Sequence, residues 1–399
     1  MIDKGKISAN QMGKMVYLAI TPTAILTAPG ISFNFARQDI WLSPVWAICG
    51  LIAVPLALGL NRLQPDCSAV QACRNIFGRF PGWVVAGLLW LFFLYLGAII
   101  LREYGEFIVG AYLNETPLVI VLGSLVLVCA LAVRGGVEIV GRFADLFLPT
   151  FLLLFLLIML LIIPDLHITN MMPFLGDGLL PSLKGAVVLQ IWFAELSLAW
   201  FLLPFVSDRD NAKKVLWITF GAIILTLLLS NWVTLLLLGE LTGGYSFPFL
   251  ILARYIDLAE FFTHLESLFM AVWVLGAFVK VSVFFHVMTI GAAEWMGLRD
   301  FRPIVFPMAL LLTLFGIWVA SSYQEMTHSI ATSLIPYAFT MLILVPALLY
   351  IVGRIRGIGR GAGGSGGPGG TGDSGGSGGP VGASGPAARP SSGIRRFRK

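Results

Sequence analysis

Five ionisable side chains lie deep inside apolar runs of the sequence: Arg102, Glu103 and Glu106 in one run, Glu195 in a second and Lys280 in a third. An isolated charge at the centre of a bilayer costs about 3 kcal/mol even on the lenient insertion scale, so each should face a partner or water. Arg102 and Glu106 stand four residues apart on one helix face, where they can pair. Glu195 and Lys280 have no opposite charge nearby in their own runs. They are predicted to pair with each other, with the Arg102 run, or with a ligand or proton.

The chemistry of these charges is either ligand binding or charge transfer. A buried lysine can lose its proton at accessible pH, which suits proton coupling. The alternative for Arg102, Glu103 and Glu106 is a neutralised cluster that locks its helix. The sequence shows no Ser/His/Asp grouping, Gly-rich phosphate loop, paired-cysteine motif or histidine spacing for a metal. It therefore predicts a protein that is not an enzyme and has no metal site or cofactor.

The first apolar run holds a second candidate for ligand binding, the segment from Thr21 to Gly30, which includes Pro22, Thr23 and a second proline. Proline removes a backbone donor, and glycine and threonine can bend the chain or satisfy what is freed. A helix break is therefore predicted at mid-membrane, with unpaired peptide groups that could bind the carboxylate or ammonium of a ligand. A simple kink is the alternative. Tyr95, seven residues before Arg102, lies on the same face and could line the cavity or only pack.

Composition requires these residues to be positioned by membrane helices. Of the 399 residues, 58% are apolar and 12% are charged, whereas soluble domains are about half apolar and a quarter charged. A bilayer is spanned by about 20 apolar residues in a helix. Ten such runs are predicted: Met12–Ile31, Pro44–Leu60, Trp83–Leu113, Leu118–Val133, Leu146–Ile163, Leu183–Val206, Val215–Leu238, Leu265–Ala293, Ile304–Ala320 and Ile330–Val352.

The orientation follows from the basic residues. Lys and Arg gather in the N-terminal segment and in the connectors after the even-numbered runs, whereas only Arg37, Lys184 and Arg254 fall on the other side. Positive charge stays cytoplasmic, so both termini are predicted inside. The formal charge of +5 is thus read as a topology signal and not as nucleic-acid binding.

The chain is predicted to divide into a membrane domain, residues 1–360, and a tail, residues 361–399. The tail is rich in Gly, Ser and Pro and ends in basic residues. Such a segment cannot bury enough apolar surface to fold, which predicts a disordered cytoplasmic tail. Its basic end could contact anionic membrane lipid. A solvated extension without a task is the alternative.

The ten runs form two similar sets of five. In each set an amphipathic connector, Cys67–Phe77 or Phe249–Phe262, precedes the longest run, and that run carries a cation near its middle, Arg102 or Lys280. Five spans is an odd number, so the second copy must insert upside down. Such inverted repeats are typical of secondary transporters that bind ligands at mid-membrane on broken helices. The run with Glu195 has no Gly or Pro, and its break is inferred from the repeat alone.

The sequence resembles the spore germination permease family, the membrane-embedded B subunits of nutrient germinant receptors. The resemblance covers most of the chain up to about Arg360 and rests on the order and spacing of several short motifs. They are Lys6-Ile-Ser-Ala-Asn-Gln11, Ala36-Arg-Gln-Asp-Ile-Trp-Leu-Ser43, Arg102-Glu-Tyr-Gly-Glu-Phe107, Arg134-Gly-Gly-Val-Glu138, Asn170-Met-Met-Pro-Phe-Leu-Gly-Asp-Gly178, and Phe261-Phe-Thr-His-Leu-Glu-Ser267 continuing to Phe278-Val-Lys-Val-Ser282.

The resemblance implies the ten-helix inverted-repeat fold of amino acid–polyamine–organocation transporters, in the inner membrane of a spore. It implies A and C subunits as partners and a small nutrient germinant as ligand. By position, the pocket would include Thr21, Pro22, Thr23, Tyr95, Glu195, Leu198 and Ser282, with Lys280 at its floor. The implied function is to sense a germinant and trigger germination. A proton-coupled importer of amino acids or amines, and a ligand-gated ion or water channel, remain as alternatives.

Overall fold

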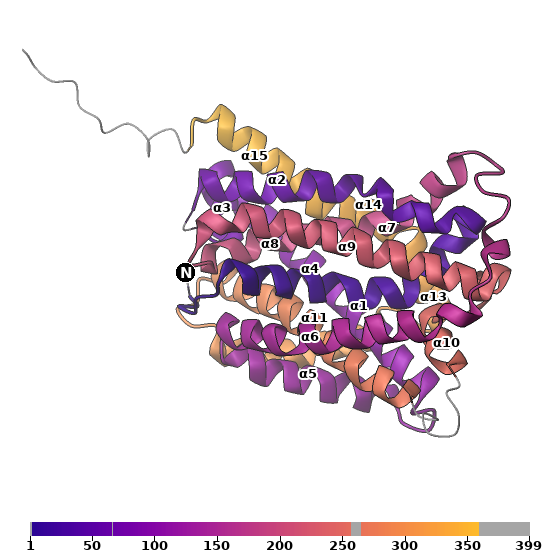
Figure 1. The fold of residues 1–399 in the computed structure, drawn as a ribbon. Helices are drawn as coiled ribbons and strands as arrows, with labels where there is room; N and C mark the ends of the chain where they lie inside the picture. Colours follow the sequence, from indigo (N-terminus) through magenta and orange to yellow (C-terminus); the bar gives the residue numbers. More distant parts are fainter. Residues whose placement is uncertain (1, 66, 257–264, 359–399) are drawn as a thin grey trace, which may run out of the picture. The chain divides into compact units, whose positions relative to one another are not determined.

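The computed structural model describes residues 2–65, 67–256 and 265–358, and the regular structure in them is helical apart from an isolated bridge between Ile7 and Val206. The helices run along one axis as a bundle (Figure 1). Its longer members are α1 (Ala9–Ala36), α2 (Ile48–Leu63), α4 (Arg79–Ala111), α5 (Leu118–Arg134), α6 (Val137–Leu161), α7 (Leu180–Ala194), α9 (Arg209–Leu238), α11 (Leu265–Trp295), α12 (Val305–Trp318) and α15 (Val345–Ile355).

Shorter elements join or interrupt these helices. The α-helical ones are α3 (Ala69–Phe77), α8 (Leu198–Leu202), α10 (Pro248–Tyr255), α13 (Tyr323–Ala331) and α14 (Leu334–Phe339). The 3₁₀ turns are η1 (Arg37–Trp46), η2 (Ile163–Asp165), η3 (Ile168–Met171), η4 (Glu195–Ser197), η5 (Leu203–Phe205), η6 (Gly239–Gly244) and η8 (Arg302–Ile304), and η9 (Thr340–Leu344) is a π-turn.

The protein is an all-helical, multi-pass integral membrane protein. Within the described residues, seven helical stretches are long and apolar enough to cross a bilayer, and the number becomes eight if one bent pair counts as a span. The bent pair joins residues 302–318 to α13 at an angle of 94°. The predicted tail lies outside the described residues, as does part of the second amphipathic connector.

Helix α1 forms the centre of the bundle, because α6, α7, α9 and α11 all pack against it. Nearly every residue from Met12 to Phe33 is buried, as a helix surrounded by other helices requires. The predicted longest spans of the two halves are α4 with 33 residues and α11 with 31. Helix α11 packs against both α1 and α4, and α4 reaches α1 through the hydrogen bond between Glu103 and Thr27. These three helices carry most of the predicted site residues.

The predicted break in the first span is wrong. Helix α1 continues through Pro22 and Pro29 without an interruption. The hydroxyls of Thr21, Thr23 and Thr27 donate to carbonyls three or four residues earlier in the same helix. Proline has a backbone φ that a helix accepts, and packing against the surrounding helices suffices to keep α1 intact. Each proline still removes the N–H that would bond the carbonyl four residues earlier, but α1 does not open into an unwound segment.

The predicted break in the run that carries Glu195 is not found, because the chain stays helical from Leu180 to Phe205. The helix only tightens to a 3₁₀ turn near its middle. Helix α7 ends at Ala194, the 3₁₀ turn η4 follows at Glu195, and the chain continues through α8 and η5. The tenth span has the opposite irregularity, because α14 passes into the π-turn η9 before α15. The two turns touch, since the Ser197 hydroxyl donates to the Leu342 carbonyl at 2.7 Å.

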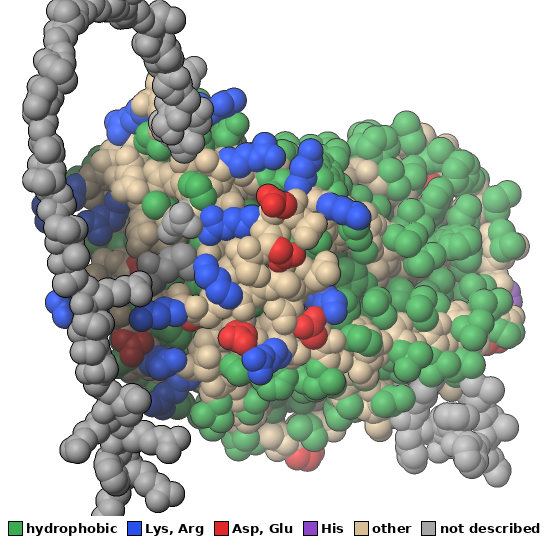
Figure 2. Space-filling view, turned by 60° about the vertical axis from the view of Figure 1, so that its left-hand side comes forward, with side chains coloured by type: hydrophobic (Ala, Val, Ile, Leu, Met, Phe, Trp, Pro, Cys, Tyr) green, Lys and Arg blue, Asp and Glu red, His purple; other side chains and the backbone are tan. Residues whose placement is uncertain are grey.

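The N-terminus and the end of α15 lie at the same end of the bundle (Figure 1). That end is covered with Lys and Arg side chains, whereas apolar side chains cover the flank of the bundle (Figure 2). Exposed basic residues there include Lys4, Arg74, Arg142, Lys214 and Arg354. This is the charge asymmetry that the basic connectors predict.

The N-terminal segment is fastened to this basic end by Asp208. The Ala9 backbone N–H donates to Asp208 Oδ1 at 2.6 Å, and the Asn211 amide donates to Oδ2 at 3.3 Å. These hydrogen bonds, that of Ala9 foremost, lower the pKa of Asp208 below its ordinary 3.8.

The stability that Asp208 contributes should therefore be present above pH 3.8 and be lost as the pH falls through its lowered pKa. Asp208→Asn should lower the free energy of unfolding by less than about 1 kcal/mol near neutral pH, because water screens this partly exposed group. The difference from the unmodified protein should shrink in acid. Thermal unfolding of both proteins in detergent between pH 7 and 3 measures it, with Asp210→Asn as the control. A difference that does not vary with pH would contradict the assignment.

Candidate functional site

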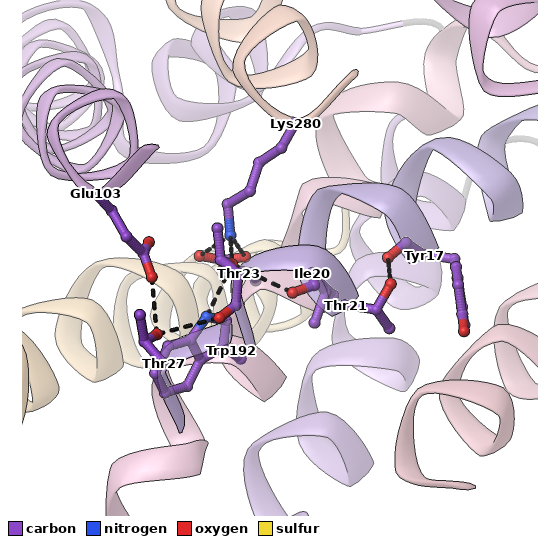
Figure 3. A network of polar contacts seen from close by, with 9 residues as sticks. Tyr17, Ile20, Thr21, Thr23, Thr27, Glu103, Trp192 and Lys280 are labelled. Atoms are coloured by element: carbon purple, nitrogen blue, oxygen red, sulfur yellow. Dashed lines mark hydrogen bonds and ion pairs between the residues drawn. The ribbon is translucent and has the colours of Figure 1, made fainter. Parts of the chain in front are cut away.

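A buried ion pair joins α11 to the 3₁₀ turn of the sixth span. Lys280 Nζ lies 2.9 Å from Glu195 Oε2 and 3.2 Å from Oε1, and 2.8 Å from Thr23 Oγ1 of α1 (Figure 3). The side chains of Lys280 and Glu195 are only 1% and 2% exposed. The sequence left several possible partners for Lys280 and Glu195, and in the structure these two residues pair with each other. The three contacts tie α1, η4 and α11 together at one point.

Thr23 is the hub of this network. Its hydroxyl accepts hydrogen bonds from Lys280 and from the Trp192 indole N–H of α7, the latter at 3.1 Å. It donates its own hydrogen to the Ile20 carbonyl at 3.3 Å. One donated and two accepted bonds use the full capacity of a hydroxyl. The Trp273 indole of α11 binds the neighbouring Pro22 carbonyl at 2.9 Å, which fixes the same stretch of α1 from another side.

A second carboxylate approaches α1 from α4. Glu103 Oε1 lies 2.8 Å from the Thr27 hydroxyl, which also contacts the Thr23 carbonyl at 3.1 Å. Thr27 has one hydrogen and can donate to only one of these acceptors at a time. Both bonds form together when Glu103 carries a proton and donates to Thr27. The geometry therefore provides a place for a proton one helical turn from the Lys280 hub.

The predicted pair on α4 is confirmed. Arg102 Nη2 lies 2.6 Å from Glu106 Oε1, and Nη1 donates to the Ile317 carbonyl at 3.2 Å near the end of α12. Arg102 thus bridges α4 to the point where α12 bends toward α13.

The remaining predicted residues are distributed unevenly around the network. Thr21 is buried on α1, but its hydroxyl binds the Tyr17 carbonyl (Figure 3). Leu198 is buried at the start of α8, directly after the turn that carries Glu195. Ser282 is buried on α11, and among the described residues its hydroxyl has no hydrogen-bond partner. Tyr95 packs its ring against Tyr337 of α14, at 5.7 Å between centroids, and does not join the polar network that Figure 3 draws.

Sequence reasoning missed the two tryptophans that hold α1. Trp192 and Trp273 occur in apolar runs where an aromatic residue is expected to pack. A usable signal exists, because a buried indole N–H must find an acceptor inside a membrane helix bundle. The acceptors used are the Thr23 hydroxyl and the Pro22 carbonyl of α1. Which acceptor an indole uses depends on helix packing and cannot be read from the sequence.

The structure is similar to those of known transporters. It matches Mhp1, a nucleobase-cation-symport-1 family transporter in a closed conformation with bromovinylhydantoin bound, with a TM-score of 0.63 and 13% identity, over 89% of this chain and 91% of the other. It matches MhsT in complex with L-phenylalanine with a TM-score of 0.64 and 14% identity, over 87% and 89%. At these identities the likeness concerns the fold, which is the fold of these transporters.

Relatives by sequence belong to one group of proteins. The chain is 26% identical over 330 residues to spore germination protein KB of Bacillus subtilis (strain 168), covering 81% of this chain and 88% of that protein. It is 20% identical over 319 residues to spore germination protein XB of Bacillus anthracis, covering 78% and 89%. The model of a family described as "Spore germination protein" matches residues 6–328. This match spans most of the chain, and the protein therefore belongs to the spore germination protein family.

Proposed function

We propose that this chain is the germinant-sensing membrane subunit of a spore germinant receptor, located in the inner membrane of the spore. It binds a small polar nutrient near mid-membrane, between α1, α4, η4 and α11, and works with A and C subunits. The family match and the transporter fold support the class of protein. The observation that carries the ligand site is the buried network of Lys280, Glu195 and Thr23, which joins three helical elements at one point.

The topology that goes with this proposal has ten spans in two inverted sets of five, with both termini cytoplasmic. The ten apolar runs of the sequence all fall on helices. Two of these helices, α2 with 16 residues and α5 with 17, are shorter than a typical membrane-spanning helix. The shared basic end of the N-terminus and α15 supports the orientation. The helices change pitch at η4 and η9, and we infer that these turns correspond to the discontinuous helices that line mid-membrane sites in secondary transporters.

The charge of the network favours a ligand with a positive group. Arg102 and Lys280 face three carboxylates, those of Glu103, Glu106 and Glu195, so one negative charge is in excess. A buried excess charge requires a proton or a cation. Because α1 is unbroken, it offers no peptide N–H groups to a carboxylate, and an ammonium or a cluster of hydroxyls on the ligand suits the site better.

Ligand binding would act through the network that joins the helices. A ligand group that reaches Glu195 or Thr23 competes with Lys280 for its acceptors and changes how η4 is held against α1 and α11. A ligand shifts an equilibrium between two conformations only by its difference in affinity for them. Analogues that bind both conformations equally should therefore occupy the site without triggering germination.

The test is a panel of amino acids, amines, sugars and nucleosides, scored by thermal shift on the purified chain. The ligand found should bind Glu103→Gln at least about tenfold more weakly if its positive group takes the excess charge. Glu240→Gln, an exposed outer residue, serves as the control. A ligand that binds Glu103→Gln as well as the unmodified chain would contradict the charge argument.

Transport distinguishes the remaining possibilities. Concentrative uptake of the labelled ligand into proteoliposomes under a pH gradient would favour a proton-coupled importer. The transporter fold and the buried carboxylates, which could carry protons, are compatible with that function. Conductance that depends on the ligand, without its uptake, would favour a channel. Binding with neither supports the receptor.

A further inference from the structure

A long groove opens on the flank of the bundle, away from the polar network. Its walls are α6 and α9, and its floor is α1, which lies between them in Figure 1. The cavity measures about 380 Å³. Its apolar lining includes Leu152 and Phe155 from α6 and Ala222 and Leu229 from α9.

The groove has a polar end and an apolar end. Asn10 and Lys14 of α1 lie at the end near the basic face. The lining toward the middle of the bundle is apolar except for Thr219 and for Tyr17 and Thr226, whose hydroxyls bind each other at 2.7 Å. Along α9 it extends from Val215 to Leu229, about 21 Å at 1.5 Å per residue. Half of a bilayer's hydrocarbon core is about 15 Å thick, so the groove crosses a full leaflet.

Positive charge surrounds the polar end. Lys14 is paired with Asp145 at 2.8 Å, and the second oxygen of Asp145 accepts from Gln11, so this carboxylate is already satisfied. Exposed Lys214 stands one turn before Ile218 of the groove, on the same face of α9. Exposed Arg142 stands on α6 one turn before Asp145 and is paired with Glu138. Because Lys14 and Arg142 each have a carboxylate partner, Lys214 is the cation whose charge these two pairs leave in excess, and it would meet an anion at the level where lipid headgroups lie.

We propose that this groove is a binding site for an anionic phospholipid of the leaflet on the basic side. One acyl chain lies along α9 over the floor formed by α1, and the phosphate lies near Lys14 and Lys214. The polarity, depth and charge of the groove match the three parts of such a lipid, from headgroup to chain end. A transmembrane helix of another protein would also cover an apolar groove, but it would not require the basic end.

The site touches the helix that carries the ligand network. Tyr17 lies in the groove, and Thr23 lies less than two turns further along α1. A bound lipid would therefore hold α1 between α6 and α9 at the level where the segment Ile7–Lys14 leaves the membrane.

The experiment uses native mass spectrometry of the full chain in detergent with added dipalmitoyl phosphatidylglycerol or phosphatidylcholine. The unmodified chain should retain phosphatidylglycerol in preference to phosphatidylcholine. Ala222→Trp, which fills the groove, should weaken retention of one phosphatidylglycerol molecule at least about tenfold, as expected when an acyl chain loses its contacts. Leu131→Trp on the outside of α5, where Leu131 is 59% exposed, is the control for added aromatic surface.

A second pair of variants tests the headgroup without altering the core. Lys214→Gln should reduce the preference for phosphatidylglycerol about threefold to tenfold, whereas Lys213→Gln, its neighbour on a different helix face, should leave it unchanged. Equal lipid retention in Ala222→Trp and Leu131→Trp, or an equal preference in both lysine variants, would overturn the proposal. The thermal shift given by the ligand is measured separately from lipid retention. A variant that loses the lipid but keeps the ligand shift is altered at the groove alone, so a failure of the lipid proposal can be told apart from a failure of the proposed function.

Discussion

Replacing Lys280 by Met should abolish the ligand response and destabilise the protein by about 3–5 kcal/mol. The reason is the environment of Glu195, which is 2% exposed and would lose its cation while remaining buried. Thr23 would also lose a donor. The measurements are the midpoint of thermal unfolding and the thermal shift given by the ligand identified in the panel.

A double variant separates stability from recognition. Adding Glu195→Gln to Lys280→Met removes the unpaired charge, so most of the lost stability should return while the ligand response stays absent. Lys213→Met, exposed at the basic end, should change neither quantity. If Lys280→Met unfolds normally and still responds to ligand, Lys280 has no part in the site.

Arg102→Leu should destabilise the protein by about 2–4 kcal/mol. Arg102 is 6% exposed and holds both Glu106 and the Ile317 carbonyl, so its removal leaves a partly buried carboxylate and a helix-end carbonyl without their donor. The effect should extend to the bend between α12 and α13. Hydrogen exchange of the residues around Ile317 measures this, together with thermal unfolding.

The matched variant is Glu106→Gln, which keeps the shape of the side chain and removes only its charge. Because Glu106 is 20% exposed, water can partly replace it as a partner, and the loss should stay near 1 kcal/mol. The Ile317 contact should survive in this variant, with exchange around the bend unchanged. Equal losses in Arg102→Leu and Glu106→Gln would show that the bond to Ile317 contributes nothing.

The sequence was most informative where one strong physical rule acts alone. The cost of burying charge predicts that Arg102 pairs with Glu106 and that Lys280 finds a carboxylate, and both pairs are present. Apolar length and basic connectors likewise predict the helices and the charged end of the bundle. These features depend on single residues or on neighbours along one helix.

Local rules failed where two effects compete. Pro22 and Pro29 predict a break in α1, but packing against the surrounding helices keeps the helix whole. The change from α-helix to a 3₁₀ turn at Glu195 has no Gly or Pro to mark it. It occurs where α7, α1 and α11 meet around a salt bridge. Its position is therefore set by contacts between distant segments, which a single sequence does not display.

The hydrogen bond between Ser197 and Leu342 couples the 3₁₀ turn η4, which is wound more tightly than an α-helix, to the π-turn η9, which is wound more loosely. A 3₁₀ turn rises about 2.0 Å per residue and an α-helix about 1.5 Å, so converting the three residues of η4 to α-helix would shorten that span by roughly 1.5 Å. The π-turn η9 has more residues per turn than an α-helix, so its helix can change length by converting between π and α geometry when η4 moves. The far end of this helix is held by Arg356, which donates to the Ile76 carbonyl of α3 at the basic surface. A change of helical pitch beside Glu195 can thus be transmitted through the π-turn and α15 to α3 at the basic end of the bundle.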